Sequence, residues 1–138
     1  MKAYLAIKYH QNQENREAIE RISAALAHHG LETVCVVRDL ELWGEVCFTA
    51  VELMQKSFTA LETSDVIIVE LTEKGVGVGI EAGYAAAKGI PIITIASAGA
   101  DISDTLQGIS HAVLSYAHVD DLPALLAHPL AALGLINA

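Results

Sequence analysis

The residues best suited to chemistry are one acid and the glycines that precede it. Gly75, Gly77 and Gly79 alternate with valines, and Glu81 follows two residues later. Alternate glycines let a backbone approach a ligand without Cβ hindrance and turn N–H groups toward it. An acid at a helix N-terminus is stabilised as an anion by the helix dipole. This segment therefore predicts a ligand site, in which Glu81 is either a reactive carboxylate or only a first-turn acid that complements the dipole.

Apolar runs and helical periodicity alternate along the whole chain and must position this segment. Five strands are predicted, at residues 3–7, 33–37, 65–71, 90–96 and 112–116. Helices are predicted around residues 19–26, 51–61, 80–88, 103–109 and 122–133, and the glycine-rich residues 72–79 are predicted to be a loop. Such alternation implies parallel strands with helices on both faces. We expect an α/β fold: a single doubly wound, Rossmann- or flavodoxin-like domain over residues 1–138, with a five-stranded parallel sheet.

Composition excludes several classes of partner. The formal net charge of −9 and the scattered basic residues argue against binding a nucleic acid polymer. No apolar run approaches the roughly 20 residues that span a bilayer, and no leader opens the chain, so we expect a cytoplasmic protein with no membrane partner. Cys35 and Cys47 form no CxxC pair, so we expect two reduced core or near-core thiols, and neither a metal nor a cofactor.

Ligands of such sheets bind beyond the carboxyl ends of the strands, where four loops compete: residues 8–12, 38–45, 72–79 and 97–103. A dinucleotide fingerprint also fits residues 77–82, with Asp101 about twenty residues on. The fingerprint belongs on the first strand–helix turn, however, and that turn has no glycine. A phospho-receiver needs acids after the early strands, whereas the first strand ends at Lys8, and the hydrolase motif GxSxG is absent from the sequence.

Three segments, Asp65–Leu71, Gly75–Ala85 and Lys88–Ile92, resemble the nucleoside 2-deoxyribosyltransferase family, most closely its deoxynucleoside 5′-monophosphate N-glycosidases. The likeness is strong over residues 57–116 and looser toward the amino end. It implies that Glu81 is a nucleophile that attacks the anomeric carbon of a nucleoside sugar. The base then leaves, a glycosyl-enzyme ester forms, and water or a second base resolves it.

The resemblance also suggests roles for other residues. It implies that Tyr4 helps to orient the nucleophile and that the three glycines surround a small nucleoside or nucleotide substrate. Ser103 matches a serine that holds a 5′-phosphate, although it also suits the N-cap of the helix that follows. Lys8 and His10 place positive charge in the first loop, where they either help to hold that phosphate or are simply solvated. The family tends to complete its site across a subunit interface, and the aliphatic helices at residues 50–61 and 122–133 further suggest a homo-oligomer, most simply a dimer.

The chain departs from the family at three places. Ser57 stands where the family usually has an Asp, Gly75 where it has Asp or Ser, and the bulky residues 8–12 where it is rich in Gly and Ser. Trp43 either covers a base or is merely packed. The leading hypothesis is an enzyme that cleaves or exchanges an N-glycosidic bond. The alternatives are a nucleotide-binding module of the same fold with weakened catalysis, and an unrelated α/β cofactor or interaction domain.

Overall fold

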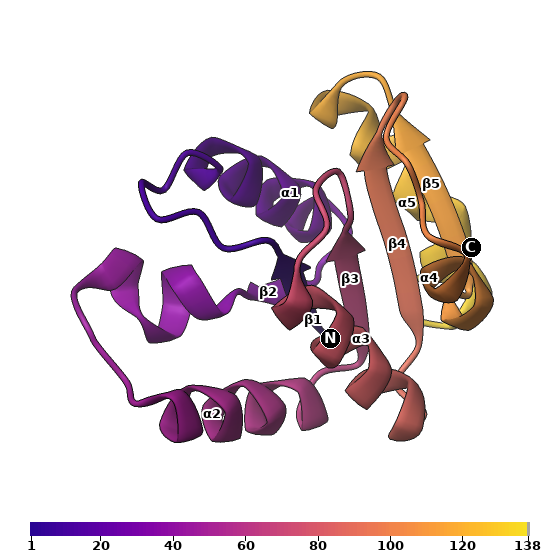
Figure 1. Ribbon diagram of the computed structural model, residues 1–138. Helices are drawn as coiled ribbons and strands as arrows, with labels where there is room; N and C mark the ends of the chain where they lie inside the picture. The colour runs from indigo at the N-terminus through magenta and orange to yellow at the C-terminus, as the bar shows by residue number, and fades with distance from the viewer. Residues whose placement is uncertain (138) are drawn as a thin grey trace.

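The five strands form one all-parallel sheet, which confirms the predicted α/β fold (Figure 1). The computed structural model describes residues 1–137. The strands are β1 (Lys2–Ile7), β2 (Glu32–Val34), β3 (Val66–Glu70), β4 (Ile92–Ser97) and β5 (Ala112–Tyr116). Their order is β2-β1-β3-β4-β5. The chain thus adds β2 on one side of β1 and all later strands on the other, which places the switch point of the sheet between β1 and β3.

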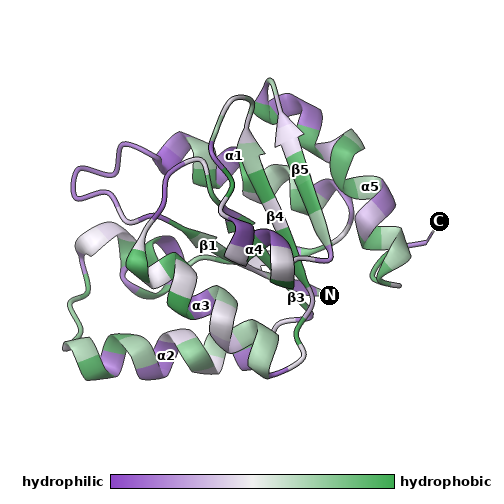
Figure 2. Ribbon diagram, turned by 45° about the vertical axis from the view of Figure 1, so that its right-hand side comes forward, coloured by the Kyte–Doolittle hydropathy of each residue, from purple (hydrophilic) through white to green (hydrophobic). Residues whose placement is uncertain are grey.

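Helices cover both faces of this sheet. They are α1 (Arg16–His28), α2 (Ala50–Glu62), α3 (Val76–Ala87), α4 (Asp104–Ile109) and α5 (Leu122–Ala132). Two separate cores result, one under α1 and α5 and one under α2, α3 and α4. Successive residues of β1 point to opposite faces of the sheet. Ala3 and Leu5 pack in the core under α1 and α5, and Tyr4 and Ala6 pack in the core under α2, α3 and α4. The central strands β3 and β4 are mostly apolar, as expected where both faces are covered (Figure 2).

The second strand is shorter than the sequence predicts. Its β-branched run was expected to extend through Val37, but β2 ends at Val34, and Val36–Leu40 form one turn of π-helix. The Asp39 side chain explains this turn, because its Oδ2 accepts a hydrogen bond of 2.8 Å from the Cys35 backbone N–H. A 3₁₀ turn, Leu42–Gly44, follows before α2. The segment between β2 and α2 thereby arches away from the sheet (Figure 1).

The helix that carries Glu81 begins earlier than predicted. We expected it at residue 80, after a glycine-rich loop, but α3 begins at Val76 and contains two of the three glycines. Burial explains the difference. Val78, Ala82 and Ala85 lie at helical spacing and pack on the sheet, each at most 2% exposed, and this packing outweighs the low helix propensity of glycine. Glu81 therefore lies in the second turn of α3 rather than at its N-terminus.

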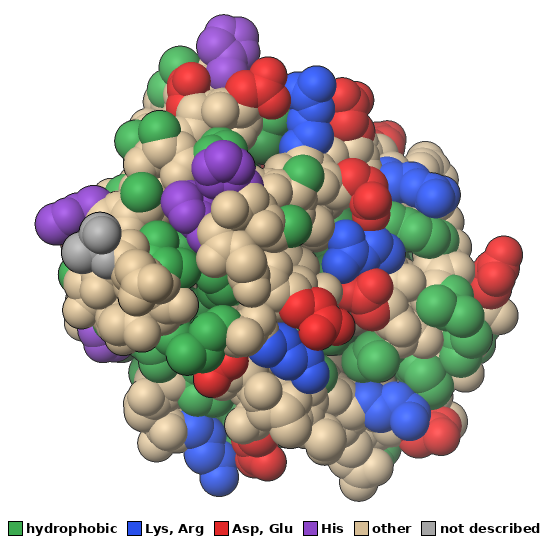
Figure 3. Space-filling view, turned by 180° about the vertical axis from the view of Figure 1, so that it is seen from behind, with side chains coloured by type: hydrophobic (Ala, Val, Ile, Leu, Met, Phe, Trp, Pro, Cys, Tyr) green, Lys and Arg blue, Asp and Glu red, His purple; other side chains and the backbone are tan. Residues whose placement is uncertain are grey.

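The expected apolar stripe of α2 is incomplete. Val51 is exposed, and the buried residues of the helix are Ser57 and Leu61. Cys35 is buried as expected, whereas Cys47 is exposed rather than near the core. No helix within residues 1–137 is long and apolar enough to cross a membrane. Acidic and basic side chains are interspersed on the face opposite that of Figure 1 (Figure 3).

Candidate functional site

The main cavity of the molecule lies beside the switch point of the sheet. Its volume is about 380 Å³, which is within the range of small-molecule sites. Four elements wall it: β1, the segment after β2, α2 and the first turns of α3. The side chains of chemical interest that line it are Tyr4, Lys8, Tyr9, Cys35, Glu41, Ser57 and Glu81. The structure thus brings five of the predicted site residues together: Tyr4, Lys8, Ser57, Gly77 and Glu81.

Glu81 is the most perturbed carboxylate of the site. Burial raises its pKa to about 7, and contact with the Tyr4 hydroxyl offsets part of that rise. This corrects the expectation that a helix N-terminus keeps the carboxylate ionised. In the second turn of α3 the backbone N–H groups are already bonded within the helix, so desolvation dominates over the dipole. The group changes its charge near neutral pH, which suits a reacting carboxylate.

Tyr4 and Ser57 form the polar floor of the cavity. The Tyr4 side chain is fully buried, and its hydroxyl makes no hydrogen bond of regular geometry within residues 1–137. Burial and the neighbouring Glu81 charge both raise the Tyr4 pKa, so the phenol stays protonated as a donor. The Ser57 hydroxyl donates to the Leu53 carbonyl over 2.8 Å. The hydroxyl proton is therefore engaged within α2, and Ser57 supplies no acid to the cavity.

The predicted glycines have three different environments. Gly77 lines the cavity, and a Cβ placed there would lie 3.7 Å from Glu81 Oε1. Gly75 is the N-cap of α3, where a Cβ would meet the Lys8 side chain at 3.4 Å. Gly79 has no neighbour within 4 Å of such a Cβ, and its N–H bonds to the Gly75 carbonyl. Only Gly77 therefore makes room beside the carboxylate, and the Gly79 N–H is bonded within the helix rather than turned toward a ligand.

The two basic residues of the first loop are engaged by acids. Lys8 Nζ lies 3.4 Å from Glu73, and His10 Nε2 lies 3.2 Å from the same carboxylate. His10 does not line the main cavity. It lines an adjoining cavity of about 160 Å³, which shares Ile7 and Lys8 with the first. Any anion held by Lys8 must therefore compete with Glu73.

Ser103 and Trp43 lie outside the main cavity. Ser103 is the N-cap of α4, since its hydroxyl oxygen accepts from the Leu106 N–H. The structure thus gives it the capping role, which does not require a ligand. Trp43 packs against the core under α1 and α5, and the Arg16 guanidinium lies 4.5 Å above its ring. Asp101, the acid of the dinucleotide alternative, forms an ion pair of 2.6 Å with Lys74.

Sequence reasoning missed two acids near the cavities. Glu41 lines the main cavity, and burial raises its pKa above the ordinary value. Glu70, at the end of β3, is only 4% exposed. It accepts hydrogen bonds from the Thr72 N–H and hydroxyl and from the Tyr116 hydroxyl, so it ties the carboxyl ends of β3 and β5 together. The alternation of apolar and polar residues gives no signal for Glu41, whereas an acid ending an apolar strand could have marked Glu70.

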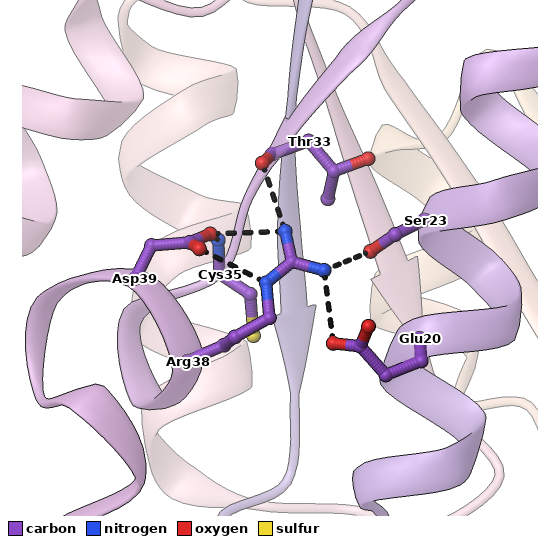
Figure 4. Close-up of polar contacts among 6 residues, drawn as sticks. All are labelled: Glu20, Ser23, Thr33, Cys35, Arg38 and Asp39. Atoms are coloured by element: carbon purple, nitrogen blue, oxygen red, sulfur yellow. Dashed lines mark hydrogen bonds and ion pairs between the residues drawn. The ribbon is translucent and has the colours of Figure 1, made fainter.

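A network around Arg38 holds the wall that carries Glu41 (Figure 4). The guanidinium donates to the Thr33 carbonyl over 3.0 Å, to the Ser23 hydroxyl over 2.7 Å and to Asp39 over 2.9 Å. It also lies 3.3 Å from Glu20 on α1. These contacts join the π-helical turn to β2 and α1. The network therefore anchors the turn that leads into Glu41 to two neighbouring elements.

The fold and the site together define a class of protein: a parallel α/β fold with a small-molecule cavity beside its switch point and a carboxylate of perturbed pKa on the cavity wall. Residues 3–121 match the family model described as nucleoside 2-deoxyribosyltransferase. The chain belongs to the nucleoside 2-deoxyribosyltransferase family. Membership indicates an enzyme of the deoxyribosyltransferase type that acts on small nucleoside or nucleotide substrates.

Solved structures share this fold at low sequence identity. A CMP N-glycosidase from Clostridium botulinum is 19% identical, with a TM-score of 0.66 over 93% of this chain and 98% of that one. A 2-deoxyribosyltransferase from Bacillus psychrosaccharolyticus is 19% identical, with a TM-score of 0.72 over 89% of this chain and 90% of that one. A conserved protein from Enterococcus faecalis V583 is 13% identical, with a TM-score of 0.64. No curated protein sequence matches the chain.

Proposed function

We propose that the protein cleaves or exchanges the N-glycosidic bond of a nucleoside or its 5′-monophosphate through a covalent glycosyl-Glu81 intermediate. The observation that carries this proposal is the position of Glu81, a carboxylate with a pKa of about 7 on the wall of a 380 Å³ cavity. A retaining mechanism needs a carboxylate that can reach the anomeric carbon of a bound sugar and that is ionised when it attacks.

In the first step a Glu81 oxygen bonds to the anomeric carbon while the bond from that carbon to the base nitrogen breaks. The electron pair leaves with the base, which takes up a proton from solvent. In the second step water or another base attacks the same carbon and gives up a proton to solvent, the ester bond breaks, and the Glu81 carboxylate is regenerated. The buried Tyr4 hydroxyl lies next to Glu81 and would donate to one carboxylate oxygen in both steps. Gly77 leaves space for the sugar beside Glu81.

The alternative is a nucleotide-binding module that has lost turnover. One observation favours it: Ser57 lies on the cavity floor where the family carries an acid, and its hydroxyl proton is committed to the Leu53 carbonyl. The residue therefore cannot protonate a departing base. Binding of nucleotides without base release is the outcome that would support this alternative.

The test is a base-release assay over ribo- and deoxyribonucleosides and their 5′-monophosphates. We expect the parent protein to release a base from at least one of them. Glu81→Gln, which keeps the volume and removes the charge, should lower the rate by several orders of magnitude. Intact-mass spectrometry after acid quenching should show the glycosyl adduct on the parent and not on the variant. Equal rates for parent and Glu81→Gln would refute the nucleophile.

Glu73→Gln serves as the matched control in this assay. It removes a carboxylate from the rim and leaves Glu81 untouched. Turnover by this control together with loss in Glu81→Gln would separate the nucleophile from a general effect of charge.

We further propose that a second copy of the chain covers the cavity on the side of α3. Val76, which lines the cavity, is 82% exposed, and Ile80 of the same helix is 47% exposed.

A further inference from the structure

Glu41 is a carboxylate in the main cavity for which the double displacement has no use. It comes from the segment after β2, and it lies where the main cavity meets a cavity of about 60 Å³ under the first loop. Glu81 lines only the main cavity. The two acids therefore lie at different parts of the site, and a substrate whose sugar meets Glu81 has room to extend its base toward Glu41.

The Glu41 carboxylate has no ion pair or hydrogen-bond partner within residues 1–137, although cations lie nearby in sequence or in space. Arg38, three residues away, is held by Asp39 and Glu20. Lys8 is paired with Glu73, and Arg16 stacks over Trp43. Because each cation is engaged elsewhere, the acceptor capacity of Glu41 is left for a ligand.

Glu41 is partly buried, so a bound ligand would determine whether its carboxylate keeps hydrogen-bond donors. A ligand that fills the cavity removes water from Glu41, and an anion that loses water without gaining donors is strongly disfavoured. The Arg38 contacts tie the turn that precedes Glu41 to α1 and to β2 (Figure 4). A ligand with N–H groups at this position is accepted, and one that presents only oxygen is rejected.

We propose that Glu41 selects the base of the substrate, by accepting hydrogen bonds from an exocyclic amino group. Guanine suits it best among the common bases, because its ring N–H and amino group present two parallel donors to the two oxygens of one carboxylate. Cytosine and adenine present an amino group alone. This inference rests on the proposed function for its substrate class, and its test separates the two.

The test compares nucleoside pairs that differ at the exocyclic amino group. Guanosine is paired with inosine and cytidine with uridine, each as the ribo- and the deoxyribonucleoside. We expect kcat/KM for the amino-bearing member to exceed that of its partner by at least about tenfold in one pair. Glu41→Gln should bring this ratio toward one, because an amide offers a donor where the carboxylate offers only acceptors. Glu45→Gln, an exposed acid of the same segment, should keep the parent ratio.

A purely structural role would lower both members of a pair equally and leave the ratio unchanged. Affinities for the same pairs are also measured in the Glu81→Gln background, so selection is read from Kd without any turnover. A parent ratio near one in every pair, or a ratio unaltered by Glu41→Gln, overturns the assignment of Glu41. Base release by the parent with that result leaves the proposed function intact. Selective binding without base release refutes the proposed function and supports Glu41.

Discussion

Gly77 lies against the carboxylate of Glu81, so that a Cβ at position 77 would stand 3.7 Å from Oε1. That distance is an ordinary van der Waals contact, and the residue is helical. Gly77→Ala should therefore fold and gain roughly 0.5–1 kcal/mol from better helix propensity. The added methyl group occupies space needed by the sugar, so kcat/KM should fall by at least about tenfold.

Gly79→Ala is the matched control for this prediction. Gly79 lies two residues after Gly77 in the same helix, and a Cβ added at position 79 would meet no atom within 4 Å. It should gain similar stability and keep the parent activity. Thermal unfolding and base-release rates measure both effects. Full activity in Gly77→Ala would show that the sugar does not approach this side of Glu81.

The ionisation of Glu81 predicts the pH dependence of activity. Its pKa is about 7, and the nucleophile must be charged, so kcat/KM should rise with pH through about 7. The neighbouring Tyr4 hydroxyl lowers that pKa by favouring the charged form of the carboxyl group. Tyr4→Phe removes this donor, and the midpoint should move to higher pH. Tyr84→Phe, on the same helix as Glu81 but bonded to Glu62, should leave it in place.

A pH–rate profile of the three proteins decides this prediction. An unchanged midpoint in Tyr4→Phe would mean that the phenol does not contact the nucleophile in the working enzyme.

The ion pair between Lys8 and Glu73 predicts how a 5′-phosphate is recognised. The pair is 3.4 Å long and sits at the rim of the main cavity. Lys8→Ala should reduce the preference for a monophosphate over its nucleoside by about tenfold, the value of a charge-assisted contact. Glu73→Gln should increase the preference, because it frees the lysine. Lys88→Ala, paired with Glu62 away from the cavity, is the control.

Titration calorimetry of a nucleoside and its monophosphate gives the two affinities needed for each protein. Equal affinities in the parent, a preference unchanged by Lys8→Ala, or changes of the same sign in the two rim variants would exclude Lys8 as a phosphate ligand.

Exposed apolar residues on α2 and α3, two helices that wall the cavity, predict a dimer. Val51 on α2 is 67% exposed and Ile80 on α3 is 47% exposed, and the two helices pack together. Val51→Asp and Ile80→Asp should each shift the mass from dimer to monomer in light scattering at micromolar concentration. Val113→Asp, at the edge strand β5, should not. A dimer lost only in Val113→Asp would place the interface at the sheet edge instead.

The regular part of the fold could be predicted because burial alone determines it. An unbroken apolar run predicts the strand β3. The helical spacing of Ile19, Ile22 and Leu26 predicts the helix α1. The start of α3 could not be predicted, because local propensity and tertiary packing disagree at Gly77. The π-helical turn after β2 was missed for a similar reason, since its stability depends on side chains of Arg38 and Asp39.

The site could be predicted only where a motif marks it. Glu81 follows a run of glycines, but Glu41 is forty residues away and only the fold brings it to the same cavity. The charge of Lys8 was visible in the sequence, whereas its partner Glu73 depends on how two loops meet. Long-range pairings of this kind leave no periodic signal.

The burial of Glu81 makes the stability of the folded chain depend on pH. A carboxyl whose pKa is about 7 in the folded chain and near its ordinary 4.5 in the unfolded chain favours folding fully only below about pH 4.5. That support is lost as pH rises toward 7, by up to about 3 kcal/mol. The working, ionised state of the protein is thus its less stable one. Glu81→Gln should accordingly melt at a higher temperature than the parent at pH 8, with the gap closing at pH 4.5.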